Sequence, residues 1–341
     1  MVDTLYQNLS IDDRRYALKA AQDKGRYRAF LLEKDIWVVV TLSALFDAPF
    51  ADHLTFKGGT SLSKVWRVIR RFSEDVDITY DIRAFAPDLV AGSGAEALPP
   101  TRSQEKRWTR AIRTRLVEWV RDHAFPYVTE RITQTGFEAE VRAEADSLFV
   151  SYEPLFEQVS FVRPEVKVEF GARSTGEPHK LLPVACDASA HLPNLVFPQA
   201  RPNTMLAERT FWEKATAAHI YCRREKGRGE RLSRHWHDLA RLDKSGIAVT
   251  ALADKELAMS VARHKAIFFS EKDVRGERID YQAAVSGDLQ LVPSGTARAV
   301  LADDYARMVE SGMLLDEHES FDALMEHCAS LEARANGLNI S

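Results

Sequence analysis

Residues 56–82 read FKGGTSLSKVWRVIRRFSEDVDITYDI, and the hydrophobic period changes partway along them. A short apolar run ends in a glycine pair, and a helix is expected to begin at Thr60 or Ser61, both good N-terminal capping residues. Apolar residues then recur at helical spacing at Leu62, Val65, Trp66 and Ile69. After Phe72 the period becomes two, with Val76, Ile78, Tyr80 and Ile82 alternating with Asp75, Asp77, Thr79 and Asp81. The sequence therefore predicts a strand end, a glycine turn, a helix and a half-buried strand in direct succession.

The rest of the chain divides into a mixed first part and a helical second part. Besides a helix over 33–47, the patterns predict strands over 137–142, 147–152 and 165–171. Between them lie a loop-like stretch over 83–104 and a basic helix over 105–123. Proline-rich residues 191–203 indicate a boundary, after which the pattern is almost wholly helical. We therefore expect an α+β fold, with one domain over 1–195 and a mainly helical domain over 196–341.

Composition restricts the class of protein further. The 341 residues carry a formal net charge of −4, and 45% of them are hydrophobic, as in ordinary globular proteins. Three distant cysteines, Cys186, Cys222 and Cys328, form no CxxC pair, so a reducing compartment is indicated and no catalytic role is assigned to them. The N-terminal residues lack a signal-peptide pattern, and no apolar run approaches the ~20 residues that span a bilayer. We expect a cytoplasmic protein with no membrane partner.

Basic residues are concentrated in a few segments. Residues 102–121 contain seven Lys/Arg against two acidic residues, and residues 223–244 contain eight against four. Further basic residues stand at Lys64, Arg67, Arg70 and Arg71. Any one such block is often a solvated helix face. Taken together, the blocks keep a polyanionic partner as a hypothesis.

Asp75 and Asp77 stand two residues apart on the predicted strand, so their side chains point to the same side, roughly 6.5–7 Å apart. Such a pair can share a divalent cation in the all-oxygen shell that Mg²⁺ takes. Glu169, on the polar face of another predicted strand, would add a third carboxylate if the two strands are neighbours. Three carboxylates suit a two-metal phosphoryl-transfer site. A solvated strand face is the alternative interpretation of the pair alone.

The glycine pair supplies a second, independent signal. Gly58 and Gly59 lack a Cβ, so the backbone can approach a ligand closely, and the helix start behind them suits a phosphate. Thr60 and Ser61 add hydroxyl groups, and Lys64 lies one turn farther along. The same GGTS sequence also occurs as an ordinary helix cap. A Walker P-loop is disfavoured because GxxxxGK[ST] is absent.

In this order, FKGGTSLSKVWRVIRRFSEDVDI resembles the signature of the AbiEii/AbiGii toxin family of nucleotidyltransferases, relatives of the polymerase-β-like superfamily. EKD at 33–35 resembles the family's N-terminal helix, and KVEFGAR at 167–173 its third-carboxylate strand. FWEKATAAH at 211–219 resembles its lysine motif, and LSRHWHDLARL at 232–242 its late arginine–aspartate motif. Similarity to the C-terminal helical region extends over 264–269 and 291–308, so the resemblance covers nearly the whole chain.

The resemblance implies a nucleotidyltransferase-like mixed β-sheet with flanking helices, followed by the helical domain. It implies that Gly58, Gly59, Thr60, Ser61 and Lys64 hold the triphosphate, with Ser73 close to the metal site. Asp75 and Asp77 would bind Mg²⁺ or Mn²⁺, and Glu169 would complete the acidic site. Glu169 departs from the pattern, because the superfamily often has aspartate there.

Two residues of the helical part are assigned roles by the resemblance alone. Lys214 would contact the nucleotide phosphates, and Asp238 would lie near Lys214, orienting it or contacting the nucleotide. Taken singly, each has an ordinary interpretation as a solvated helix charge. His235 and His237 lack the i, i+4 spacing of a zinc-binding helix, and His219 and His264 are interpreted as core or interface residues.

The function that the resemblance implies is transfer of a nucleoside monophosphate from an NTP, releasing pyrophosphate, by the toxin of a bacterial toxin–antitoxin or phage abortive-infection system. The acceptor would be RNA such as the tRNA 3′ end, and the partner an antitoxin with a helix-turn-helix domain. Two alternatives stay open: a small-molecule or protein acceptor, and a non-catalytic nucleotide-binding module.

Overall fold

The computed structural model describes residues 4–25, 27–69, 71–157, 163–224, 231–315 and 318–337. Arg70 and residues 225–230 of the second basic segment lie outside the described residues. The chain forms two compact units, each discontinuous in sequence. The first contains residues 1–65, 72–89 and 108–205; the second contains residues 66–71, 90–107 and 206–341. These units do not end at residue 195, and the division into a domain over 1–195 and a helical domain over 196–341 stays a prediction.

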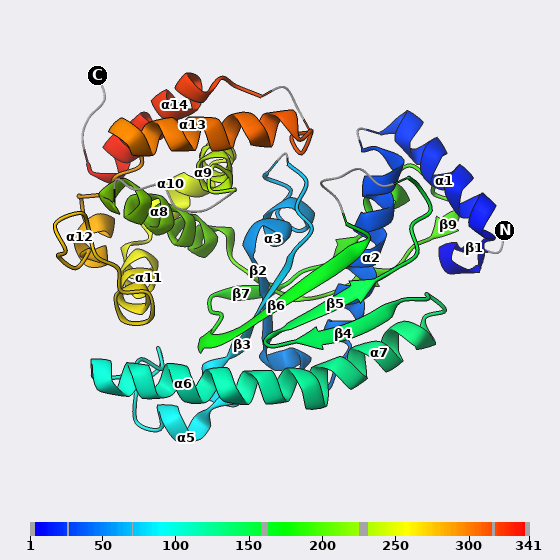
Figure 1. The fold of residues 1–341 in the computed structure, drawn as a ribbon, viewed down its shortest axis with the longest axis horizontal. Helices are drawn as coiled ribbons and strands as arrows, with labels where there is room; N and C mark the ends of the chain where they lie inside the picture. The colour runs from blue at the N-terminus through cyan, green and yellow to red at the C-terminus, as the bar shows by residue number, and fades with distance from the viewer. Residues whose placement is uncertain are drawn as a thin grey trace. The chain divides into compact units, whose positions relative to one another are not determined.

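A seven-stranded mixed sheet forms the centre of the first unit, in the order β4-β5-β6-β3-β2-β11-β7 (Figure 1). In chain order the strands are β2 (Leu54–Lys57), β3 (Val76–Asp81), β4 (Glu140–Glu144), β5 (Ser147–Ser151), β6 (Glu165–Ser174), β7 (His179–Leu181) and β11 (Asn203–Met205). The pairs β3–β6 and β2–β11 are parallel, and the other pairs are antiparallel. Two small additional sheets pair β1 (Thr4–Leu5) with β9 (Leu195–Val196) and β8 (Val184–Ala185) with β10 (Gln199–Ala200).

Helices of the first unit are α1 (Ile11–Lys24), α2 (Ala29–Phe46), α3 (Gly58–Lys64), α4 (Ile82–Phe85) and α7 (Phe125–Gln134). The unit boundaries run through α5 (Pro87–Val90) and α6 (Arg102–Trp119), and a π-helical turn over Val120–Ala124 joins α6 to α7. Helix α2 contacts β6, and α7 contacts both α2 and β4. Nearly all of α2 is buried, including its charged residues Glu33, Lys34 and Asp35.

The second unit is mainly helical, as the sequence predicts. Its helices are α8 (Ala207–Arg224), α9 (Arg234–Lys244), α10 (Ile247–Ala253), α11 (Lys255–Phe268), α12 (Tyr281–Val285), α13 (Gly295–Glu310) and α14 (Phe321–Ala335). Helix α8 contacts α9, α10, α11 and α12, so it lies at the centre of this unit. The mixed sheet and the helical second unit confirm the α+β fold class.

The predicted helix over Thr60 to Ile69 is wrong in its second half. Helix α3 begins at Gly58 and ends at Lys64, and Arg67 has a φ of +53°. Leu62 is buried in the first unit, whereas Ile69 is buried in the second, because the chain passes from one unit to the other after residue 65. The apolar spacing therefore reflects two cores rather than one helical face.

Other boundaries differ more modestly from the predicted ones. Residues 83–104 are not one loop, since α4 and α5 lie within or beside this stretch and α6 begins at Arg102. The strand predicted over 137–142 is shifted and forms β4 over Glu140–Glu144. Among the described residues, no helix is both long enough and apolar enough to cross a membrane.

Candidate active site

The glycine turn and the second aspartate meet directly in the first unit. Strands β2 and β3 pair antiparallel, which places Lys57 opposite Asp77. The next residue, Gly58, has a φ of +79°, and a Cβ built on it would lie 2.1 Å from Asp77 Oδ2. Position 58 thus requires glycine twice, once for its left-handed backbone and once because the Asp77 carboxylate packs on its Cα.

The hydroxyl groups of the glycine turn are used inside the unit. Thr60 and Ser61 are fully buried. The Thr60 hydroxyl donates to the Asp75 carbonyl oxygen and lies 3.0 Å from Ser73 Oγ, while Ser61 Oγ donates to the Gly58 carbonyl at 2.9 Å. These contacts tie the start of α3 to the segment that carries Asp75. The role of Thr60 and Ser61 as phosphate contacts stays a prediction.

The two carboxylate strands are neighbours, as the candidate triad requires. Strands β3 and β6 pair in parallel, and Asp77 is the register partner of Glu169. Asp75 immediately precedes β3, and both Asp75 and Asp77 are half-buried. The Glu169 side chain is 47% exposed and forms an ion pair with Lys167. The hydrogen bond from Lys167 to Glu169 is the main cause that raises the pKa of Lys167.

Across the described residues, no three or more His, Cys, Asp or Glu side chains are gathered closely enough to hold a metal ion. The donor chemistry of Asp75 and Asp77 nevertheless fits a hard divalent cation, since both supply carboxylate oxygens at one strand end. Glu169 contacts Lys167 through Oε1, so Oε2 is the oxygen that could serve as a third ligand while the ion pair is kept. The role of all three carboxylates as metal ligands stays a prediction.

Lys64 ends α3 and is buried with two carboxylates. Its Nζ contacts Asp35 and lies 2.9 Å from Asp187 Oδ1. Burial alone would lower the pKa of Lys64, but the charges of Asp35 and Asp187 raise it above its usual value. The Lys64 charge is thus compensated within the unit, and its role as a phosphate contact stays a prediction.

In the second unit, Lys214 and Asp238 lie together. Lys214 Nζ is 2.9 Å from Asp238 Oδ2, and Asp238 is completely buried. Arg71 also binds Asp238 with two hydrogen bonds, Nε to Oδ1 at 2.8 Å and Nη2 to Oδ2 at 2.7 Å. Although burial would raise the pKa of Asp238, Arg71 and Lys214 hold it well below its usual range.

Arg71 is the residue of this cluster that the sequence did not identify. It lies 167 residues before Asp238, and in the sequence it is one of several basic residues around position 70. The arginine of the RRFSED run was the sole available signal. Full burial of Asp238 favours the predicted role of orienting Lys214 over direct nucleotide contact.

Two histidines of the second unit, His219 and His237, lie in its interior. His219 is 2% exposed, and its Nδ1 accepts a hydrogen bond from the Gln290 backbone N–H at 3.0 Å. Burial, aided by the charge of Arg223, lowers the pKa of His219 to about 4. His237 is 8% exposed, and burial lowers its pKa to about 4 as well. His219 is therefore a core residue, one of the two interpretations that the sequence allowed.

Comparison with known proteins decides the family. The family described as nucleotidyl transferase AbiEii toxin, Type IV TA system, matches residues 40–327. The chain belongs to this family. It is thus a nucleotidyltransferase toxin of a type IV toxin–antitoxin system, and the resemblance read from residues 56–82 is confirmed.

Two solved structures are similar to the AbiEii chain over most of their length. MenT4, a nucleotidyltransferase toxin from Mycobacterium tuberculosis H37Rv, is 18% identical with a TM-score of 0.41, and the match covers 98% of this chain and 100% of that one. JHP933 from Helicobacter pylori is 14% identical with a TM-score of 0.38, covering 89% and 90%. No curated protein sequence matches the chain.

Proposed function

We propose that this AbiEii protein transfers a nucleoside monophosphate from an NTP to an RNA hydroxyl such as the tRNA 3′ end. The observation that carries the proposal is the contact between Gly58 and the Asp77 carboxylate, together with the register of Asp77 and Glu169. The glycine turn at residues 58–59 and the carboxylate strands β3 and β6 therefore meet at one place. This arrangement suits a reaction in which an anionic phosphate and its counter-cation must be held side by side.

Asp75 and Asp77, joined by Glu169, would hold a divalent cation, Mg²⁺ or Mn²⁺, which when bound neutralises charge on the phosphates. The backbone at Gly58 and Gly59 would bind the triphosphate. The acceptor hydroxyl oxygen forms the new bond to the α-phosphorus, the bond from that phosphorus to the β-phosphate oxygen breaks, and pyrophosphate leaves. The hydroxyl proton passes to solvent. By its place in the family's lysine motif, Lys214 would add a positive charge for the phosphates, with Asp238 orienting it.

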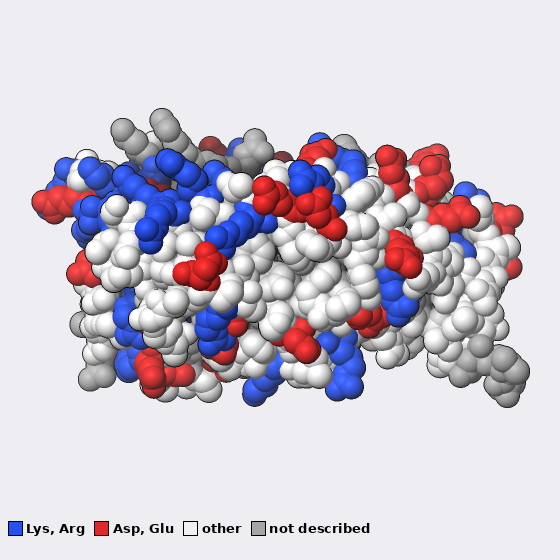
Figure 2. Space-filling view, turned by 90° about the horizontal axis from the view of Figure 1, so that it is seen from below, with Lys and Arg blue, Asp and Glu red and all other residues white. Residues whose placement is uncertain are grey.

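A basic face on α6 supports RNA as the acceptor. Lys106, Arg110 and Arg113 follow the i, i+4, i+7 spacing of one helix face, and all three are exposed. Within the described part of the chain none of the three forms an ion pair, unlike Arg115, which binds Asp88 at 2.7 Å. Figure 1 draws α6 at the bottom of the molecule, and Figure 2 shows the molecule from below. Lys and Arg side chains gather on part of the surface seen in Figure 2. Uncompensated cations of this kind bind phosphate backbones in a salt-dependent way.

The experiment incubates the protein with each α-labelled NTP, Mg²⁺ and total RNA, and compares it with Asp77→Asn. Label in RNA that depends on Asp77 supports the proposal. Label in protein would show that the acceptor is a protein and would contradict an RNA acceptor. Absence of label from both would contradict the proposed transfer reaction.

The acceptor is tested by a triple charge reversal, Lys106→Glu/Arg110→Glu/Arg113→Glu. We expect at least about a tenfold loss of RNA labelling and a smaller dependence on salt. The matched control is Lys180→Glu/Lys255→Glu/Arg275→Glu, which changes the net charge equally at exposed residues outside α6. Equal loss in both triples would contradict docking through α6. The antitoxin with a helix-turn-helix domain, implied by the family, is tested separately by co-purification.

A further inference from the structure

Three consecutive charged residues on α2 are buried, and each has different partners. Glu33, Lys34 and Asp35 are 4%, 1% and 5% exposed. Successive helix residues point about 100° apart, so the three side chains leave α2 in different directions. Buried charges are rare unless they are paired, because desolvation penalises the charged form. Their partners therefore indicate what this turn holds in place.

Lys34 contacts the beginnings of both carboxylate strands. Its Nζ lies 3.0 Å from Glu74 Oε2, and Glu74 immediately precedes Asp75. The same Nζ donates to the Arg163 carbonyl at 2.7 Å and to the carbonyl of Glu165, the first residue of β6. One ammonium group thus joins the segment that enters β3 to the segment that enters β6.

Asp35 contacts the far end of the glycine helix. Its Oδ1 pairs with Lys64, the last residue of α3, whose first residue is Gly58. Its Oδ2 accepts a hydrogen bond from the Asp187 backbone N–H at 2.7 Å, and Asp187 also pairs with Lys64. The position of α3, and with it the glycine turn, is therefore fixed from α2.

We propose that Lys34 and Asp35 are positioning residues. From a single turn of α2 they hold the carboxylate strands β3 and β6 and the glycine turn at residues 58–59 in place relative to each other. This inference rests on the proposed function, because it takes Asp75, Asp77 and Gly58 as the site. Neither residue touches substrate in this assignment. Lys34 acts through Glu74 and the start of β6, and Asp35 acts through Lys64. Misplacement of reacting groups by about 1 Å can cost about a hundredfold in rate.

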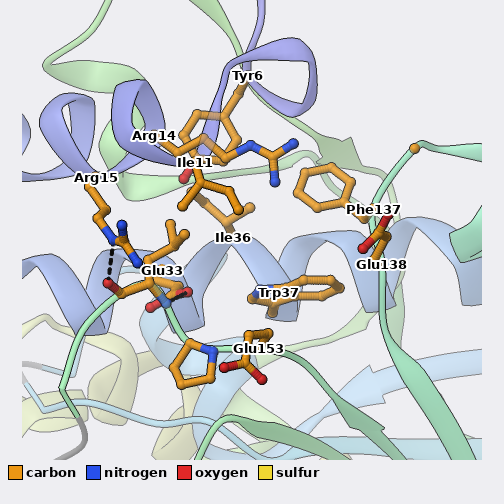
Figure 3. Close-up of a pocket in the computed structure, with 13 residues that line it drawn as sticks. Tyr6, Ile11, Arg14, Arg15, Glu33, Ile36, Trp37, Phe137, Glu138 and Glu153 are labelled. Carbon is orange, nitrogen blue, oxygen red and sulfur yellow. Dashed lines mark hydrogen bonds between the residues drawn. The ribbon is translucent and has the colours of Figure 1, made fainter.

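Glu33 provides a matched control on the same turn. It accepts a hydrogen bond from the Leu155 backbone N–H at 2.7 Å and lines a cavity of about 290 Å³ with Tyr6, Arg15 and Trp37 (Figure 3). Neither the glycine turn nor the carboxylate strands line that cavity. Glu33 is thus an ionisable side chain as buried as its two neighbours, and burial raises its pKa to about 7. Its hydrogen bond to Leu155 leads away from the candidate site.

The experiment compares Lys34→Met, Asp35→Asn and Glu33→Gln in the full chain. Thermal unfolding, binding of Mg²⁺–NTP by calorimetry and steady-state transfer are measured for each. We expect Asp35→Asn to weaken NTP binding and raise the KM for NTP at least about tenfold, because the glycine turn shifts. We expect Lys34→Met to raise the Mg²⁺ concentration needed for half-maximal activity and to lower kcat about 10- to 100-fold. Glu33→Gln should change each of these less than about twofold.

Unequal effects on NTP and Mg²⁺ would not arise from a general loss of stability. If all three variants lose activity in proportion to their unfolding temperatures, the positioning role is overturned. Should Lys34→Met or Asp35→Asn fail to fold, Lys34→Arg and Asp35→Glu are used instead, because they keep the charge and change only the size of the side chain. Lys34→Arg must then affect mainly the Mg²⁺ requirement, and Asp35→Glu mainly NTP binding. A wild-type protein that binds Mg²⁺–NTP but transfers nothing would count against the proposed function, while the calorimetric comparison would still decide the positioning role.

Discussion

At residue 58, two separate demands exclude every side chain. The backbone is left-handed with a φ of +79°, and the Asp77 carboxylate occupies the space that a Cβ would fill. In the sequence, a glycine here is explained by the close approach of a ligand to the backbone. The structure adds a close approach within the protein itself, which couples the turn to a carboxylate that binds the cation in the proposed reaction.

Gly58→Ala is expected to displace the Asp77 carboxylate and to reduce transfer activity at least about a hundredfold. Its free energy of unfolding should fall by about 1–3 kcal/mol, from backbone strain and the clash. The control is Gly246→Ala, which has a φ of +84° with nothing within 4 Å of the added Cβ. It should lose about 1 kcal/mol of stability but retain activity. Activity retained in Gly58→Ala would contradict the assignment.

Asp238→Asn is expected to leave Arg71 and Lys214 buried beside each other without an anion, and to destabilise the protein by about 3–5 kcal/mol in urea unfolding. Lys214→Met keeps the two hydrogen bonds between Arg71 and Asp238. It should therefore cost much less stability while removing transfer activity. Equal destabilisation by both variants would show that Lys214, rather than Arg71, compensates Asp238.

At the scale of elements, the helices bury ionisable side chains that differ in their partners. Helix α2 carries three buried charges and holds other segments through them. Helices α8 and α9 bury His219 and His237 in neutral form, with the pKa of each lowered to about 4. His219 uses an unprotonated ring nitrogen as an acceptor, so protonation would remove the hydrogen bond from Gln290.

These histidines make the second unit sensitive to acid. An unfolded histidine takes up a proton near pH 6.5, whereas His219 in the folded protein does so only near pH 4. Between these values the unfolded state binds more protons, so the stability is present above pH 6.5 and is lost as pH falls toward 4. We expect His219→Gln to flatten the stability–pH curve by on the order of 2 kcal/mol over this window. An equal slope in the wild type and in His219→Gln would refute the argument.

At the scale of the whole molecule, each of the two units is built from segments that are separated in the sequence. Residues 66–71 and 90–107 belong to the second unit although the first unit surrounds them in sequence. They supply it with the pair of Arg71 and Asp238 and with the pair of Glu96 and Arg263, whose atoms are 2.6 Å apart. The helical part therefore lacks two ion pairs when residues 206–341 stand alone.

We expect tagged 206–341, co-expressed with untagged 1–205, to capture it, since 1–205 contains the two missing segments. Arg71→Glu in 1–205 should reduce the recovered amount strongly. Arg115→Glu, which breaks an ion pair inside the first unit, should not. A fragment 206–341 that folds alone with full stability and ignores 1–205 would contradict this expectation.

Local sequence patterns were enough to predict the family, the α+β fold class and one segment, residues 56–82, that carries most of the candidate site. Glycine conformation, helix capping and alternating burial depend on neighbouring residues in the chain. They can therefore be predicted from residues 56–82 alone. Local order could also indicate that Asp75 and Asp77 share a face, because a strand has a period of two.

The pairing of distant residues could not be predicted from local sequence and is seen only in the folded chain. The register of Asp77 with Glu169, the binding of Arg71 to Asp238 and the partners of Lys34 and Asp35 join residues far apart in the chain. The early end of α3 has the same origin, since Leu62 and Ile69 are buried in different units. Periodicity reports that a side chain is buried but not which core buries it, and pairing of buried charges depends on contacts that local spacing does not encode.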